Sequence, residues 1–273
     1  YPKPLRLEAQ VGDKSISFET GAIAKQAGGA VIIRIGDTVV LSTAQQATKP
    51  KDTPPSFVPL SCDYKERTYA AGKIPGGFFK REGKAREKEV LASRLTDRAV
   101  RPLFPDYFNT ETQVVNMVMS FDGVNDADVI AINAASAALM ISDIPWNGPV
   151  AALRVGKLDG KFVMNPTNEQ REAAEMEMVI CGTLNGILMV EGGCKELPNS
   201  DLIAAMETAK PELEKLCQLQ IKMKEQVGKV KTPIATPEIK ADLKAAVEAL
   251  ARPEIEKILN SRPEKHAMEK ALE

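Results

Sequence analysis

Three turn signals divide much of the chain into pairs of short apolar runs, and this pattern constrains the fold more than any other feature. The turns are Gly36-Asp37, Asp159-Gly160 and Asn185-Gly186, dipeptides that favour the tight turns of β-hairpins. The chain therefore needs antiparallel pairing in several places. The strands expected around the turns are residues 30–35 and 38–42, 150–155 and 161–164, and 176–181 and 187–191.

Helical signals are interleaved with these strands. Asp126 precedes a run of small residues and can cap a helix, and Ser200 can cap a long amphipathic helix. Pro211 predicts a kink in that helix or a join between two helices. Strands interleaved with helices predict the α+β class, with helices packed on mixed sheets. The helices expected are residues 86–101, 127–140 and 200–225, and further strands are expected over residues 58–66 and 112–121.

The character of the sequence changes near residue 230. From Lys229 onward there is no aromatic residue, and short charged helices are expected behind Thr236-Pro237 and Arg252-Pro253. We therefore predict two domains, residues 1–229 and a small all-α unit over residues 230–273. The chain begins without methionine and ends inside a helix-like stretch, so we expect it to be a fragment of a longer protein.

Composition excludes several classes of function. The 36 basic and 37 acidic side chains nearly cancel, so any nucleic-acid contact must come from a local cluster. The four cysteines are far apart and form no CxxC or CxxH pair of the kind that binds zinc. His266 is the single histidine and lies near the carboxyl end, so a catalytic triad that contains histidine is not expected. We expect a cytoplasmic protein without a membrane span. The phosphate-loop and dinucleotide-binding motifs are absent from the sequence.

The strongest candidate for binding is a pair of aromatic rings beside two cations: Phe78, Phe79, Lys80 and Arg81 follow flexible glycines. A base stacked on a phenyl ring gains about 1–3 kcal/mol whatever its identity, and neighbouring cations attract the phosphates. The alternative is that the rings anchor the loop in a core, since aromatic side chains are usually buried.

The expected helix over residues 86–101 places Arg94, Asp97, Arg98 and Arg101 within a stripe of about 100°. Asp97 can hold one arginine and leave the others free for phosphate oxygens. A structural network of ion pairs is the alternative, and it is the commoner use of such a stripe.

A third set, Asp122, Asp126 and Asp128, offers oxygen atoms that suit magnesium or calcium. The spacing differs from that of a calcium loop, and capping of the next helix accounts for Asp126. We therefore expect no metal site in this chain.

Four stretches of the chain have a distinctive sequence: GGFFKREGKAREKEVLASRLTDRAVRPLFP at 76–105, GGAVIIRIGDTVVLSTA at 28–44, FDGVNDADVIAINAASAALMISDIPWNGPV at 121–150 and MNPT at 164–167. They closely resemble polynucleotide phosphorylases of bacteria and organelles. The resemblance implies a ribonuclease PH-like fold, also described as ribosomal protein S5 domain 2-like, in the first of two such domains, followed by the start of an all-helical domain.

The resemblance also implies an activity. Members of this family degrade RNA from its 3′ end with inorganic phosphate, release nucleoside diphosphates, and can run in reverse as polymerases. Three subunits form a ring, and Mg²⁺ and phosphate are bound by a second core domain that this chain lacks. Proteins of RNA-degradation complexes are further expected partners of the full-length protein, which would act in mRNA degradation and RNA processing.

Carried over by position, the resemblance assigns single-stranded RNA binding to seven residues and implies no catalytic residue in this chain. Lys80 departs from the arginine that is common in related loops, and lysine lacks a planar stacking face. The seven residues are Phe78, Phe79, Lys80, Arg81, Arg94, Arg98 and Arg101.

Two other functions fit the residues. One is a catalytically inactive module that binds RNA or scaffolds the ring. The other is a sensor in which the arginine helix binds a small anion, such as the phosphate of a nucleotide. Release of a nucleoside diphosphate separates an enzyme from both.

Overall fold

The computed structural model describes residues 4–51, 57–76, 80–234 and 240–272. The chain folds into two compact units, unit 1 (Tyr1–Ile234) and unit 2 (Ala235–Glu273). No helix in the described ranges is long and apolar enough to cross a bilayer.

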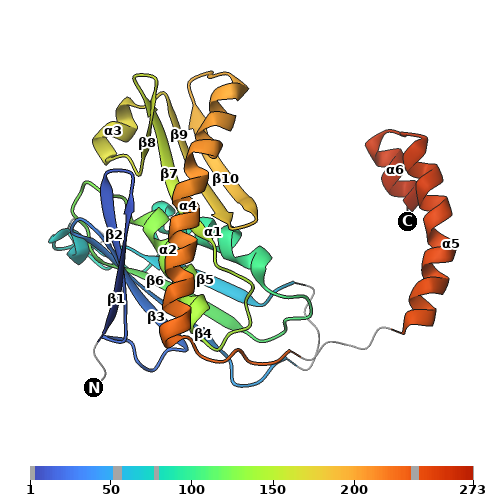
Figure 1. Cartoon of the computed structure of the whole chain (residues 1–273), viewed down its shortest axis with the longest axis horizontal. Helices are drawn as coiled ribbons and strands as arrows, with labels where there is room; N and C mark the ends of the chain where they lie inside the picture. Colours follow the sequence, from blue (N-terminus) through green and yellow to red (C-terminus); the bar gives the residue numbers. More distant parts are fainter. Residues whose placement is uncertain (1–3, 52–56, 77–79, 235–239, 273) are drawn as a thin grey trace. The chain divides into compact units, whose positions relative to one another are not determined.

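A six-stranded sheet forms the first half of unit 1 (Figure 1). Its order is β1-β2-β3-β4-β6-β5, and only the pair of β5 and β6 is parallel. The predicted hairpin around Gly36-Asp37 is confirmed, with Ile35 opposite Thr38. The strands are β1 (Leu5–Val11), β2 (Lys14–Thr20), β3 (Gly29–Ile35), β4 (Thr38–Gln46), β5 (Leu60–Lys65) and β6 (Thr112–Ser120).

A four-stranded antiparallel sheet follows, in the order β10-β9-β7-β8. It contains the other two predicted hairpins, which are confirmed: Leu158 lies opposite Lys161, and Thr183 lies opposite Gly186. The strands are β7 (Ala151–Leu158), β8 (Lys161–Met164), β9 (Met176–Thr183) and β10 (Gly186–Cys194).

Helix α2 (Ala127–Ile141) forms the centre of unit 1 and contacts both sheets through β3, β4, β6 and β7 (Figure 1). Every one of its residues except Asp128 is buried. Small side chains allow this close packing. A Cβ atom added to Gly29 on β3 would lie 2.0 Å from the main-chain oxygen of Ala138, so only glycine fits there.

The long helix α4 (Asn199–Val227) packs on α2, β1, β7 and β9. The prediction that Ser200 caps it is wrong, because Pro198 occupies the N-cap position. Of the two alternatives predicted at Pro211, the join between two helices is wrong, because one helix continues through this residue. A proline removes one helical hydrogen bond, but Ala209 and Leu213 on either side of it are buried, and packing of both halves holds the helix together.

Unit 2 contains α5 (Ala241–Asn260) and α6 (Lys265–Leu272). A helix boundary at Arg252-Pro253 was expected, and that prediction is also wrong, because α5 runs through Pro253. Arg252 pairs with Glu248 one turn before the proline and with Glu256 one turn after it. These i,i+4 pairs support the helix on both sides. Thr236-Pro237 lies outside the described residues.

The remaining helices are short or lie at the functional face. They are η1 (Thr68–Ala71), α1 (Glu87–Val100), η2 (Arg101–Leu103) and α3 (Asn168–Ala173). The predicted α+β class is confirmed, since two mostly antiparallel sheets enclose and carry these helices.

Candidate nucleic-acid interface

The aromatic-cationic loop lies between η1 and α1. Phe78 and Phe79 lie outside the described residues, whereas Lys80 and Arg81 are described and exposed. In the described part of the chain no carboxylate pairs with either cation. These two side chains are therefore available to a polyanion.

Helix α1, which carries the predicted arginine stripe, is fixed by the buried carboxylate of Glu89. This side chain is 2% exposed. It accepts a hydrogen bond from the main-chain N–H of Arg86 at the N-cap (2.8 Å) and another from the N–H of Glu66 just after β5 (2.8 Å). The start of α1 is thus tied to the end of β5, and the arginines follow on its outer side.

The three arginines of the stripe have different surroundings. Arg94 is exposed and has no ion pair or hydrogen bond to any described residue. Arg98 pairs with Glu191 on β10, and both side chains are about half exposed. Arg101 donates to both carboxylate oxygens of Asp97 and to the main-chain oxygens of Val58 and Leu60.

A groove of about 870 Å³ runs between α1 and the second sheet. It is open to solvent and large enough for a nucleotide. Its walls come from α1, the start of α2, α3, and strands β7, β9 and β10. Residues that line it include Lys88, Leu91, Asp126, Asp128, Arg154, Arg171, Glu177, Glu191 and Gly193.

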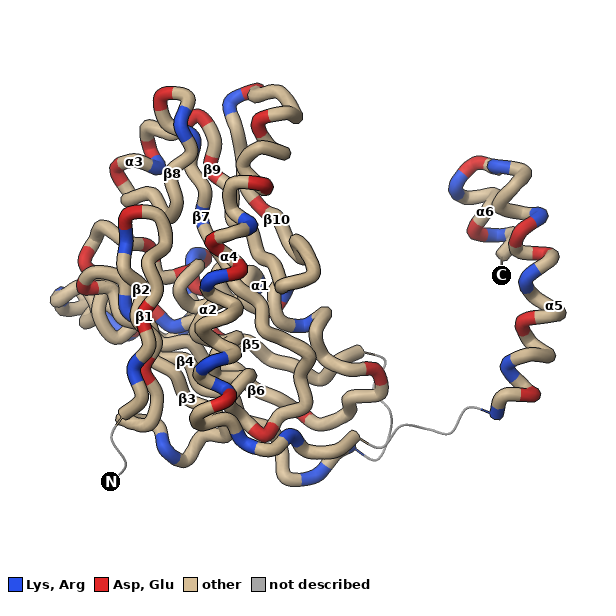
Figure 2. The backbone as a smooth tube through the Cα atoms, in the orientation of Figure 1, with Lys and Arg blue, Asp and Glu red and all other residues tan. Residues whose placement is uncertain are grey.

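Closed ion pairs bring oppositely charged residues together along this groove. Lys88 contacts Asp126 (3.2 Å) and Glu66 (3.0 Å), and Arg171 contacts Asp126 (2.6 Å) and Glu177 (2.8 Å). Arg154, whose side chain is 8% exposed, pairs with both Asp128 and Glu177. Figure 2 shows acidic and basic residues interspersed along the backbone around these elements. Each of these three cations is therefore already paired with carboxylates.

This network shifts the pKa of its members. Burial alone would raise the pKa of Asp126, but Lys88, Arg154 and Arg171 lower it below the usual value. Burial likewise opposes the charge on Lys88, while Asp126 and Glu66 raise its pKa. Both groups are therefore charged at neutral pH, and the network is a structural bridge between α1, α2 and the second sheet.

The acidic set has structural roles, as expected for Asp126. Its side chain accepts from the N–H of Ala127 at the start of α2. Asp122 accepts from the N–H groups of Val124 and Asn125, at 2.8 Å each, and from the Asn125 side chain. Although burial opposes ionisation, these bonds lower the pKa of Asp122 to about 2. Within the described ranges no three acidic, histidine or cysteine side chains gather as a metal site.

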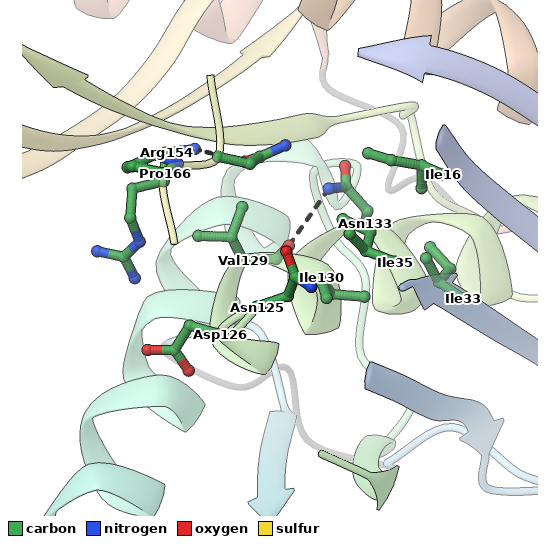
Figure 3. Close-up of a pocket in the computed structure, with 11 residues that line it drawn as sticks. Ile16, Ile33, Ile35, Asn125, Asp126, Val129, Ile130, Asn133, Arg154 and Pro166 are labelled. Carbon is green, nitrogen blue, oxygen red and sulfur yellow. Dashed lines mark hydrogen bonds between the residues drawn. The ribbon is translucent and has the colours of Figure 1, made fainter. Parts of the chain in front are cut away.

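A second, much smaller cavity lies beneath the start of α2 and is lined by Asn125, Val129 and Asn133 (Figure 3). Its volume is about 20 Å³, enough for roughly one water molecule. Figure 3 shows the charged ends of Arg154 and Asp126 extending away from the isoleucine side chains on its far side. This cavity therefore belongs to the core, and the open groove is the candidate site.

Comparison with known proteins assigns the chain to a family. Residues 12–145 match the model of the 3′ exoribonuclease family, domain 1, and residues 148–212 match that of domain 2. The chain belongs to the 3′ exoribonuclease family. Together the two models cover strands β2 to β10, helices α1 and α2, and the first half of α4.

Similar curated proteins include polyribonucleotide nucleotidyltransferases. That of Elusimicrobium minutum is 51% identical over 251 residues, which cover 92% of this chain and 36% of the relative. That of Halalkalibacterium halodurans is 45% identical over 260 residues, 95% of this chain and 36% of the relative. The chain thus spans about a third of the length of the relatives it matches, and the predicted resemblance to this group of proteins is confirmed.

A solved structure of the same fold is rice Rrp46. It covers 80% of this chain with a TM-score of 0.60 and 16% sequence identity. Since Rrp46 itself is covered over 96% of its length, this exoribonuclease-family chain has the predicted ribonuclease PH-like fold.

The sequence-based reasoning missed the residues that line the groove floor. Lys88, Arg154 and Arg171 were not singled out, nor was Glu191, the partner of Arg98. One signal was available: Arg154 stands among apolar residues of a strand, and a buried arginine requires carboxylate partners. Apart from the pair of Arg171 and Glu177, which are six positions apart, the other contacts join residues far apart in the sequence.

Proposed function

We propose that this chain is the RNA-holding part of a 3′ to 5′ phosphorolytic exoribonuclease. In that reaction a phosphate oxygen attacks the last phosphodiester of RNA, the bond from phosphorus to the preceding 3′ oxygen breaks, and a nucleoside diphosphate leaves. The curated relatives carry the name of the reverse reaction, nucleotidyl transfer. The reaction is reversible because a phosphoanhydride and a phosphodiester are exchanged.

The observation that carries the proposal is the exposure of three unpaired cations. Lys80, Arg81 and Arg94 are exposed and have no carboxylate partner in the described residues, whereas Arg98 and Arg101 hold Glu191 and Asp97. Cations that are free to meet phosphates contribute most of non-specific affinity for RNA. Phe78 and Phe79 precede Lys80 directly and would supply stacking surfaces.

Chemistry is assigned to the rest of the protein. Phosphoryl transfer requires positioned phosphate and usually Mg²⁺, and the side chains of Asp126 and Asp128 are committed to a helix cap and to ion pairs with arginines. They do not fit Mg²⁺. We therefore assign the magnesium and phosphate sites to the part of the protein outside this chain, and we expect this chain alone to be inactive.

Assembly is part of the same proposal. The chain, residues 1–229 as a first core domain and 230–273 as the start of a helical domain, would build a homotrimeric ring and thread single-stranded RNA. The full-length protein would work in the cytoplasm, where its free thiols stay reduced, with proteins of RNA degradation as partners. Sedimentation of the chain tests whether it forms trimers by itself.

One specific observation bears on the small-anion sensor. On the arginine helix, Arg98 and Arg101 are paired with Glu191 and Asp97, and the cations of the nearby groove are also paired with carboxylates. A small anion would have to displace these carboxylates. A catalytically inactive RNA-binding or scaffold module is the stronger second candidate.

The deciding experiment compares this chain with the full-length protein. Each is incubated with oligoadenylate, Mg²⁺ and phosphate, and ADP is measured. We expect both to bind the oligonucleotide and only the full-length protein to release ADP. Release of ADP by this chain alone would contradict the proposed location of catalysis, and no release by either would favour the inactive module.

A further inference from the structure

One carboxylate connects the residues just before α1 to the start of η1. Among the described residues from Ile74 to Ala85, Glu82 alone makes hydrogen bonds. Its Oε1 atom accepts from the N–H of Thr68 at 2.8 Å and from the Thr68 hydroxyl at 2.5 Å. Its main-chain oxygen accepts from the guanidinium of Arg67.

The partner of Glu82 is itself attached to the sheet. Thr68 begins η1, which directly follows β5. The N–H of Phe121, just after β6, donates to the main-chain oxygen of Ala70 at 2.8 Å, and Ala70 is buried. Glu82 is therefore connected through η1 to both β5 and β6.

The residues around Glu82 have little else to hold them. Cβ atoms added to Gly76 or Gly83 would meet no atom within 4 Å, so both glycines lie in open space. Lys80 and Arg81 are exposed and have no partner among the described residues. The direction of these two cations therefore depends on the attachment of the residue beside them.

We propose that Glu82 is a positioning residue for RNA binding, which fixes Lys80 and Arg81 by tying their segment to Thr68 and Arg67. This inference rests on the function proposed above and adds to it a residue that does not itself touch RNA. A negative charge beside two cations weakens their attraction for a polyanion. A positioning role explains why the carboxylate of Glu82 nevertheless lies next to Lys80 and Arg81.

The charge argument makes the proposal easy to test, because the two explanations predict opposite signs. The hydrogen bonds from Thr68 lower the pKa of Glu82, so the side chain is charged at neutral pH. If Glu82 acted through its charge alone, Glu82→Ala would tighten binding of RNA. If Glu82 positions the cations, Glu82→Ala weakens it.

The binding experiment uses the whole chain and fluorescent oligoadenylate at fixed salt. We expect Glu82→Ala to weaken binding about two- to tenfold, the range for one or two side chains that lose preorganisation. Glu82→Gln keeps an oxygen acceptor and should bind within about twofold of the original chain. The matched control is Glu87→Ala, which removes an exposed carboxylate from the start of α1 and should leave binding equal or tighter. Equal or tighter binding by Glu82→Ala would overturn the inference.

A second measurement tests the attachment without RNA. Trypsin cuts after Lys80 and Arg81, and Thr68→Val removes one donor to Glu82 without changing the sequence at the cut. We expect faster cleavage there in Thr68→Val and the original rate in Thr68→Ser. Unchanged cleavage in Thr68→Val would overturn the inference whatever the RNA result.

A third variant separates this inference from the proposed function. The double variant Lys80→Ala, Arg81→Ala should bind oligoadenylate at least as weakly as Glu82→Ala. If the double variant binds weakly and Glu82→Ala binds normally, the inference fails and the proposed function stands. If the double variant binds normally, the proposed role of these cations fails, and the cleavage result alone decides whether Glu82 holds the segment.

Discussion

Arg101 and Asp97 form a two-bond pair one helical turn apart: Nε of Arg101 donates to Oδ2 of Asp97 at 2.7 Å, and Nη2 donates to Oδ1 at 2.6 Å. The same guanidinium donates to the main-chain oxygens of Val58 (2.7 Å) and Leu60 (3.0 Å). All three nitrogens of the guanidinium therefore donate hydrogen bonds within the chain. At Arg101 the contacts are those of a structural ion-pair network, the alternative to phosphate binding that the sequence left open. Arg94, in contrast, is unpaired in the described residues.

Arg101→Ala should destabilise the chain. It removes charge-assisted hydrogen bonds and leaves two main-chain oxygens without their donor, a loss of about 1–3 kcal/mol. The matched control is Arg94→Ala, which should change the free energy of unfolding by less than about 0.5 kcal/mol. Urea denaturation measures both. An equal loss in the two variants would contradict the structural role of Arg101.

Arg94→Ala should instead weaken binding of single-stranded RNA and make it less sensitive to salt. Loss of one phosphate contact lowers the slope of log affinity against log salt by about 0.7 for a single strand. Fluorescence anisotropy with oligoadenylate at several salt concentrations gives this slope. Arg101→Lys, which keeps the charge, serves as the comparison and should leave the slope unchanged.

Replacement of both Phe78 and Phe79 by alanine should weaken oligonucleotide binding by about 1–3 kcal/mol for each stacked base. We expect little change in melting temperature, because the rings are proposed to meet bases. Anisotropy and thermal melting are measured on the same sample. A large fall in melting temperature with unchanged binding would restore the buried-core alternative.

Local sequence patterns predicted most of the elements, because turn dipeptides and capping residues act over a few positions. Gly36-Asp37 and Asp126 are examples. Residues 112–121 were correctly predicted as a strand. Val115 and Met117 lie on one face of it and Val114 and Val118 on the other, so alternation could not tell which face is fully buried.

Other features depended on contacts between distant residues. Pro211 and Pro253 are tolerated because of packing or ion pairs on either side of them, and local rules for proline contain no such information. The stripe on α1 was predicted, but the partner of Arg98 lies on β10, 93 residues away. The network of Lys88, Arg154 and Arg171 joins several elements and required the fold to be known.

Asp122 should make stability depend on pH in the acid range. Its pKa falls from 3.8 to about 2 on folding, so its contribution is fully present above about pH 4 and is lost as the pH falls through about 2. Asp122→Asn should flatten this dependence, and Asp106→Asn, which replaces an exposed side chain, should not. Urea midpoints between pH 5 and pH 2 measure the slope. An unchanged slope in Asp122→Asn would exclude this role.

Gly29→Ala should destabilise unit 1 strongly. The new methyl group would lie 2.0 Å from the main-chain oxygen of Ala138, so α2 must move away from β3. We expect a loss at the upper end of the ~1–3 kcal/mol that overpacking usually costs. Gly193→Ala, where the methyl group would meet nothing within 4 Å, is the control. Thermal melting compares the two, and equal melting temperatures would contradict the close packing.

The contacts of Arg101 with β5 also bear on how the protein behaves at high concentration. β5 is the last strand of its sheet, and an uncovered last strand is a template on which another chain can add a strand and begin aggregation. The main-chain oxygen of Leu60, which such a strand would need, is already bound by a guanidinium. We therefore expect Arg101 to hinder the addition of a strand from another molecule at this end of β5, because that strand would have to displace the guanidinium.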